Sequence, residues 1–158
     1  MCSGSDLVKD RLLLFVHGLG GAGQATWRDR RYPGFAELIS ADGALRELAE
    51  AAFFEYPTSL LRLPFSRIPP RIGDLAEGLR SQIEVRYPEY KSIALICHSL
   101  GGLVARKYLI EEVKQERRLR VDKLLLFAVP NNVPASLCPR DTYLGSTISS
   151  LSCVVIPN

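Results

Sequence analysis

The sequence of 158 residues contains no apolar run long enough to span a bilayer, and no basic start followed by an apolar leader. Its four cysteines, Cys2, Cys97, Cys138 and Cys153, fit neither the spacing of a zinc site nor a disulfide framework, although the last two could pair. The net charge is only +3, with both signs interspersed, which does not favour nucleic acid. We therefore expect a soluble, cytoplasmic protein with no metal, no cofactor and no nucleic-acid partner.

Nucleotide-binding motifs are also lacking. No Gly-Lys-Ser/Thr follows a glycine-rich stretch, which excludes a P-loop. Residues 18–23 match the pattern G-x-G-x-x-G, but residues 27–33 read as a polar loop closed by Pro33, where a dinucleotide site needs a helix. The acidic residue near the end of the second apolar run, Glu55, lies well beyond the usual spacing of about 20 residues. The pattern therefore does not predict a dinucleotide site.

Four short runs are almost entirely apolar, as in strands covered on both faces of a sheet. They span residues 12–16, 52–56, 93–97 and 123–128. Between them, apolar residues recur at helical spacing in three groups: Leu45, Leu48, Ala49 and Ala52; Ile72, Leu75, Leu79 and Ile83; Leu100, Leu103, Val104 and Tyr108. This alternation predicts right-handed βαβ units and a parallel sheet between two layers of helices, an α/β three-layer sandwich.

The composition changes near residue 132. Pro134, Cys138 and Pro139 follow, and no charged residue comes after Asp141. Residues 133–158 show no convincing helical period and no strand pair that would close the domain. We expect a domain core at residues 1–132 and a divergent, poorly ordered tail at residues 133–158.

The third apolar run leads directly into the sequence CHSLGG at residues 97–102. A sharp turn from strand to helix would lift the hydroxyl of Ser99 above the carboxyl end of the sheet, where such sheets bind ligands. Gly101 keeps the turn small, whereas Cys97 replaces the first glycine of the pattern G-x-S-x-G. We interpret Ser99 as a nucleophile and the N–H of Leu100 as an oxyanion donor. An ordinary helix N-cap is the alternative for Ser99.

The first apolar run ends in the sequence HGLGG at residues 17–21. Its glycines allow the backbone to approach a neighbouring group closely. We expect the N–H of Leu19 to be the second oxyanion donor, with His17 and Gly18 supporting the loop. Trp27 would either line an acyl pocket beside this loop or simply pack in the core.

These two motifs, together with the sequence PNN at residues 130–132, resemble the N-terminal half of α/β-hydrolases of the lipase and esterase type. The resemblance covers roughly residues 11–132, with Val129 where similar hydrolases often carry threonine. It implies a partial α/β-hydrolase fold with strands ordered 2-1-3-4 by chain number. It also implies that Ser99 attacks a small acyl ester or lipid-like substrate, with Leu19 and Leu100 forming the oxyanion hole.

The sequence departs from this family in its catalytic base. Such hydrolases place an acid and then a histidine after later strands, but the only histidines here, His17 and His98, both precede Ser99. His98 is the variable residue of the elbow, which the turn points away from the nucleophile. Asp141 could orient a histidine, but none follows it. Because an unactivated serine is a weak nucleophile, we expect a truncated hydrolase that is weak or inactive.

Two functions therefore remain open from the sequence. The first is a carboxylic-ester hydrolase in which Ser99 forms an acyl-enzyme. The alternative is a non-catalytic binding module, or a fragment, derived from an α/β-hydrolase. In either case the strand at residues 123–128 would leave an uncovered sheet edge, through which the chain could self-associate.

Overall fold

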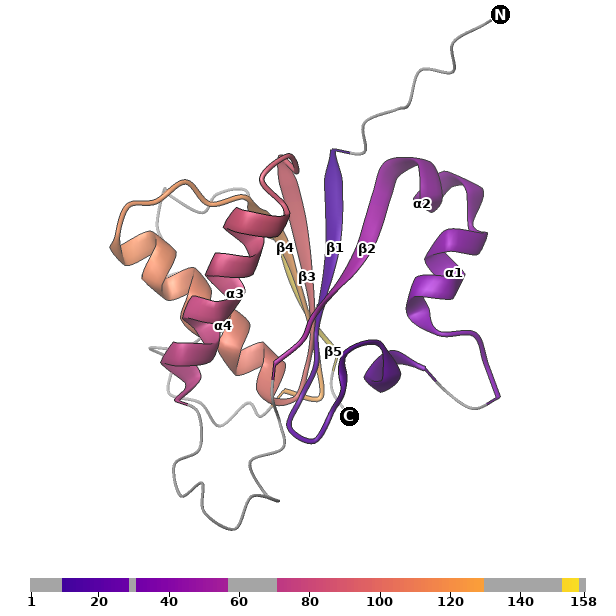
Figure 1. The fold of residues 1–158 in the computed structure, drawn as a ribbon, viewed down its shortest axis with the longest axis horizontal. Helices are drawn as coiled ribbons and strands as arrows, with labels where there is room; N and C mark the ends of the chain where they lie inside the picture. The colour runs from indigo at the N-terminus through magenta and orange to yellow at the C-terminus, as the bar shows by residue number, and fades with distance from the viewer. Residues whose placement is uncertain (1–9, 29–30, 57–70, 130–151, 157–158) are drawn as a thin grey trace, which may run out of the picture.

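A computed structural model describes residues 10–28, 31–56, 71–129 and 152–156 of the chain. The elements alternate between strand and helix along most of this length (Figure 1). In chain order they are β1 (Arg11–Val16), the 3-10 helix η1 (Gly23–Trp27), α1 (Phe35–Ala41), α2 (Gly43–Leu48), β2 (Ala49–Phe54), α3 (Ile72–Arg86), β3 (Ser92–His98), α4 (Leu100–Lys114), β4 (Val121–Phe127) and β5 (Ser152–Ile156).

The described strands form one parallel sheet in the order β2-β1-β3-β4-β5. The first four strands have the order that the sequence predicted, and the three-layer α/β architecture is confirmed. The expected number of strands is wrong, because Ser152–Ile156 pairs with β4 from Lys123↔Ser152 to Phe127↔Ile156. β5 thus occupies the edge that we expected to be open, and self-association through that edge has no support in this fold.

The first apolar helical group, Leu45, Leu48, Ala49 and Ala52, is a further correction. Helix α2 ends at Leu48, and Ala49 and Ala52 belong to β2, where they pair with Arg11 and Leu14 of β1. Pairing with β1 and burial of Ala49 decide the conformation there, so the strand begins three residues earlier than expected. The boundary expected at residue 132 lies outside the described residues and stays a prediction.

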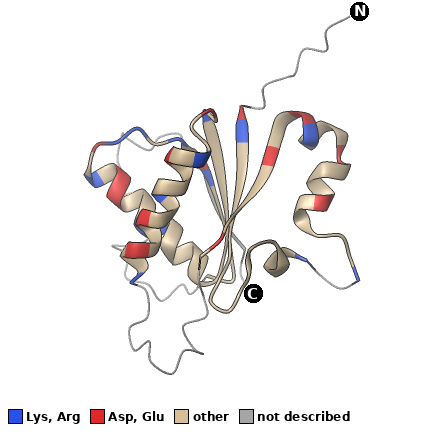
Figure 2. Cartoon of the chain, viewed as in Figure 1, with Lys and Arg blue, Asp and Glu red and all other residues tan. Residues whose placement is uncertain are grey.

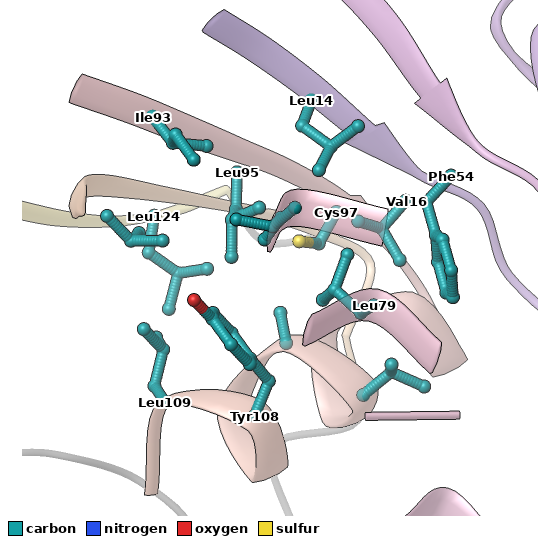
Figure 3. Packing of buried hydrophobic residues seen from close by; sticks show 14 of the residues in the cluster. Leu14, Val16, Phe54, Leu79, Ile93, Leu95, Cys97, Tyr108, Leu109 and Leu124 are labelled. Carbon is teal, nitrogen blue, oxygen red and sulfur yellow. The ribbon is translucent and has the colours of Figure 1, made fainter. Parts of the chain in front are cut away.

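One side of the sheet, which we call the thick face, is covered by α3 and α4. Residues at every fourth position of α3, Leu75, Leu79 and Ile83, are buried against alternate residues of the strands. Figure 3 shows this packing, with Leu14, Val16, Leu95 and Cys97 from the sheet facing Leu79, Tyr108 and Leu109 from the helices. The thick face holds most of the buried apolar surface of the described residues.

The other side, the thin face, carries η1, α1 and α2 (Figure 1). Only Phe15, Ile96 and Ile39 are buried in its cluster. Its remaining members are half-buried, namely Leu13, Trp27, Ala51, Phe53, Leu125 and Phe127. Across the described segments, no helix is both long enough and apolar enough to cross a membrane.

Candidate active site

Ser99 lies in the turn between β3 and α4 with φ 50° and ψ −122°. Residues other than glycine rarely adopt this backbone conformation. It costs about 1–3 kcal/mol and is found mainly at functional sites. The N–H of Ser99 donates to the carbonyl of Phe127 at 3.0 Å, and its own carbonyl accepts from the N–H of Gly102 at 3.0 Å. These two bonds anchor the turn to the end of β4 and the start of α4.

The geometry does not support an ordinary N-cap at Ser99. A capping serine has extended backbone angles, and its hydroxyl accepts a hydrogen bond from the first turn of the helix. Ser99 has a positive φ, and its side chain makes no capping bond. The hydroxyl of Ser99 therefore does not cap the N-terminus of α4.

The first turn of α4 lies very close to the end of β1. A Cβ atom at position 101 would overlap the carbonyl oxygen of Val16 and lie 2.6 Å from that of His17. Glycine at this position lets the helix begin directly behind Ser99. The small side chain expected at Gly101 is thus required by the backbone of β1.

The residues that follow β1, numbered 17–22 and here called the glycine loop, lie against Ser99. A Cβ atom at Gly18 would come within 2.8 Å of the Cβ of Ser99. The loop turns back on itself because the N–H of Gly21 donates to the carbonyl of Gly18 at 3.2 Å, and Gly20 has a φ of 76°. The Leu19 side chain is 58% exposed. Residues 17–19 and 98–100, which we singled out separately, thus meet at the carboxyl end of the sheet.

His17 is buried, and both of its ring nitrogens are engaged with the backbone. Nδ1 lies 2.9 Å from the carbonyl of Gly18, to which it can only donate. Nε2 accepts from the N–H of Tyr56 at 3.5 Å, so the proton resides on Nδ1. In this arrangement His17 holds the glycine loop and has no free nitrogen to act as a base.

Tyr56 is a site residue that the sequence did not predict, and its ring stacks on that of His17 with centroids 4.2 Å apart. Its hydroxyl donates to the carbonyl of His17 at 2.6 Å. Burial, and to a lesser extent electrostatic interaction with Cys97, raise the pKa of Tyr56 to about 12. Its place at the end of the second apolar run, and so at the carboxyl end of the expected sheet, was the signal available in the sequence.

His98 points to the thin face, because alternate residues of β3 face opposite sides and Cys97 is buried on the thick face. Its ring meets Trp27 edge-on at 6.3 Å, and its Nδ1 is buried without a hydrogen-bond partner. His98 lines a pocket of about 370 Å³ together with the glycine loop, Ala25 and Thr26. Ser99 does not line this pocket, so the side chains of His98 and Ser99 lie on different sides of the turn.

Trp27 packs rather than lining that pocket. Its ring lies 5.1 Å from Phe15 and 6.3 Å from Phe127, both in edge-on geometry. The 3-10 helix that it ends, Gly23–Trp27, is only five residues long. The G-x-G-x-x-G pattern is therefore not followed by the α-helix that a dinucleotide site requires.

The surroundings of Ser99 carry no charge on either described motif. Residues 17–26 and 97–105 contain no Asp, Glu, Lys or Arg, and Figure 2 shows the glycine loop and the start of α4 in tan. The side chain of Glu55 lies against Gly23, the residue that follows the loop. Among the residues that the structure describes, no group of His, Cys, Asp and Glu could hold a metal ion. Asp141 and residues 130–132 lie outside the described segments.

No protein-family model matches the chain, and no curated protein matches it. Among solved structures, the lipase BlEst2 of Bacillus licheniformis is similar with a TM-score of 0.54 and 18% identity, over 78% of this chain and 42% of the lipase. A lipase-esterase related protein of Clostridium acetobutylicum (TM-score 0.47, 15% identity, 78% and 44% covered) is also similar. So is the RedJ thioesterase of Streptomyces coelicolor (TM-score 0.46, 20% identity, 75% and 38% covered).

The similarity to BlEst2 shows the fold. The described chain has the partial α/β-hydrolase fold that the sequence predicted. It spans about two fifths of the length of these proteins.

Proposed function

We propose that this chain carries the nucleophile and the oxyanion-binding loop of a serine hydrolase that acts on carboxylic esters. The backbone of Ser99 is the observation that supports this most. Its positive φ costs free energy, its hydroxyl caps no helix, and Gly18 brings the glycine loop to within contact of its Cβ. A serine held in this way at the carboxyl end of a parallel sheet is typical of a nucleophile.

In the proposed reaction, Oγ of Ser99 adds to the acyl carbonyl carbon of the ester. The ester C–O bond then breaks, the alcohol leaves with the proton from the serine, and an acyl-Ser99 ester remains for hydrolysis by water. The N–H of Leu100 lies in the first turn of α4, where N–H groups have no partner within the helix. With the N–H of Leu19, it would stabilise the negative charge on the carbonyl oxygen, each donor contributing about 2.7–4 kcal/mol.

The substrate proposed is a small, neutral acyl ester or a lipid-like ester. The uncharged sequence on both sides of Ser99 offers no partner for an ionised substrate, and the fold likeness to a lipase supports the same class. A cytoplasmic location is proposed from the sequence alone.

The alternative function, a non-catalytic binding module, is supported by the lack of a catalytic base among the described residues. His17 has both nitrogens engaged with backbone groups, and His98 faces the thin side of the sheet. The described residues thus offer Ser99 no histidine, and a hydrolase that loses its base retains only about 10³–10⁴-fold acceleration over water. A non-catalytic binding module built on the same fold would fit this arrangement equally.

The test is covalent labelling of the purified full chain by an alkyl fluorophosphonate, read by intact mass. Three proteins are compared: wild type, Ser99→Ala and Ser40→Ala. Ser40 is a matched control, because it is an exposed serine of α1 whose hydroxyl already donates to the Ala36 carbonyl at 2.8 Å. Circular dichroism confirms that all three are folded.

The proposed function expects one adduct in wild type and in Ser40→Ala, and none in Ser99→Ala. That result would mean that Ser99 is activated, and ester hydrolysis would then be measured with short-chain and long-chain substrates. A folded wild-type protein that takes up no label would favour the binding module.

A further inference from the structure

Tyr56 makes three separate contacts with His17, the residue that begins the glycine loop. Its hydroxyl donates to the His17 carbonyl at 2.6 Å, its N–H donates to Nε2 at 3.5 Å, and the two rings stack with an interplanar angle of 9°. Only 8% of Tyr56 is exposed.

These contacts continue to the turn that carries Ser99. Nδ1 of His17 donates to the Gly18 carbonyl at 2.9 Å, and the same carbonyl accepts from the N–H of Gly21 at 3.2 Å. Gly18 in turn lies against the Cβ of Ser99. An unbroken series of short contacts therefore joins the phenol of Tyr56 to the loop beside Ser99.

The carbonyl that Tyr56 holds also determines where α4 begins. A Cβ atom at Gly101 would lie only 2.6 Å from the carbonyl oxygen of His17. Movement of that oxygen would therefore disturb the first turn of α4 as well as the glycine loop. The glycine loop and the first turn of α4, which lie on either side of Ser99, therefore both depend on the position of the His17 carbonyl oxygen, the acceptor of the Tyr56 hydrogen bond.

We propose that Tyr56 is a positioning residue, which sets the distance between the glycine loop and Ser99 by fixing the carbonyl of His17. This inference rests on the proposed function for its effect on chemistry, because oxyanion donors act only at about 2.7–3.1 Å from the charged oxygen. A displacement of about 1 Å in such a site can cost roughly 100-fold in rate. Tyr56 itself touches no reacting atom in this scheme.

The phenol suits this role because it remains a donor across the neutral range. Burial raises its pKa to about 12, so the hydroxyl keeps its proton. Without that proton, the buried His17 carbonyl would lose a partner that water cannot replace. The hydrogen bond, and not merely the bulk of the ring, is therefore the feature to remove.

The experiment compares Tyr56→Phe with Tyr90→Phe in the full chain. Tyr90 is a matched control, since it is 6% exposed and its hydroxyl donates to the Glu50 carboxylate at 2.7 Å, in the segment between α3 and β3. The first measurement is hydrogen exchange of the Gly21 amide by NMR, which requires no activity. The second is the rate constant of fluorophosphonate labelling.

We expect Tyr56→Phe to speed exchange of the Gly21 amide about tenfold and to slow labelling roughly 10-fold to 100-fold, with Tyr90→Phe changing neither. Equal exchange at Gly21 in the two variants overturns the proposal. If wild type takes up no label, the proposed function fails, and the exchange measurement alone decides the role of Tyr56.

A second substitution guards against loss of folding in Tyr56→Phe. A fluorinated tyrosine at position 56 keeps the shape of the side chain but lowers the pKa of the phenol, so the proton leaves at mildly alkaline pH. His17 and Cys97 are the titratable groups in contact with or electrostatically coupled to this phenol. Exchange at Gly21 rises with pH in both proteins because it is catalysed by hydroxide. A steeper rise in the fluorinated protein than in wild type supports the proposal, and identical profiles overturn it.

Discussion

The two faces of the sheet differ in how completely they are covered. On the thick face, the inward residues of β1 and β3 are excluded from solvent by α3 and α4, as Leu12 and Leu95 show. On the thin face, neighbouring residues of the same strands, such as Leu13, remain partly exposed beneath α1 and α2. Because side chains alternate along a strand, the same stretch of sequence contributes to both faces.

This difference is most informative in three successive residues. Cys97 is completely buried on the thick face, His98 faces the thin side and its pocket, and Ser99 occupies the turn above both. The thick face supplies the packing that can offset the cost of the Ser99 backbone. The thin face leaves room beside the glycine loop. We infer that stability is concentrated on one face and access to the site on the other.

The largest expected effect tests this inference on β4, where Leu124 faces the thick side and Leu125 the thin side. Leu124→Ala should lower the free energy of unfolding by about 2–5 kcal/mol, because it opens a cavity in a closely packed cluster. Leu125→Ala should cost about 1 kcal/mol, since that side chain is already partly hydrated. Urea denaturation measures both, and equal losses would mean that the two faces contribute alike.

The next effect concerns pH, because three tyrosines of the thick-face cluster have raised pKa values. Burial is the largest cause for Tyr56, whose pKa is about 12, and also raises the pKa values of Tyr90 and Tyr108. The unfolded chain releases these protons near pH 10, whereas the folded chain retains them to higher pH. Stability is therefore fully present below pH 10 and falls as the pH rises further.

For Tyr56 alone, a difference of about two pKa units corresponds to roughly 3 kcal/mol, most of which is lost as the pH rises from 10 to 12 and the rest above pH 12. Unfolding by urea at several pH values between 8 and 12 measures the loss. The same series in Tyr56→Phe should show a smaller decline, because that variant has no phenol to ionise. Parallel declines in the two proteins would contradict the assignment to Tyr56.

The sequence predicted those parts of the fold that depend on local pattern. The apolar runs and the helical spacing of Leu75, Leu79 and Ile83 predicted the first four strands and helix α3, whereas the strand order was implied by the resemblance to α/β-hydrolases. The residues of β5 were not recognised, because a single run of five residues gives no indication of its partner until β4 lies beside it. Ala49 was assigned to a helix for a similar reason, since its pairing with Arg11 comes from a distant part of the chain.

The residues of the candidate site also fall into two groups, those that a sequence motif predicts and those that only the packing reveals. Ser99 and Gly18 belong to short motifs that can be read directly, and the structure brings them into contact. Tyr56 belongs to no motif, and its importance depends on the atoms of His17 that it meets. The positive φ of Ser99 could be expected from the motif, but the hydrogen bonds of His17 could not. Contacts between segments nearly 40 residues apart are decided by packing and leave no periodic signal.

The smallest expected effect tests whether the close packing of the thick face extends to the carboxyl end of the sheet, where Ser99 lies. Gly101→Ala should lower the free energy of unfolding by about 1–3 kcal/mol, because the new methyl group would overlap the Val16 carbonyl. Gly73→Ala is the matched control in α3, where a Cβ meets nothing within 4 Å. That change should stabilise the protein by about 0.5–1 kcal/mol, as alanine favours a helix over glycine. Thermal unfolding compares the two variants.

If Gly101→Ala proved as stable as wild type, the start of α4 would have room to move away from β1. The backbone of Ser99 would then depend on its own hydrogen bonds to Phe127 and Gly102, and not on packing against β1.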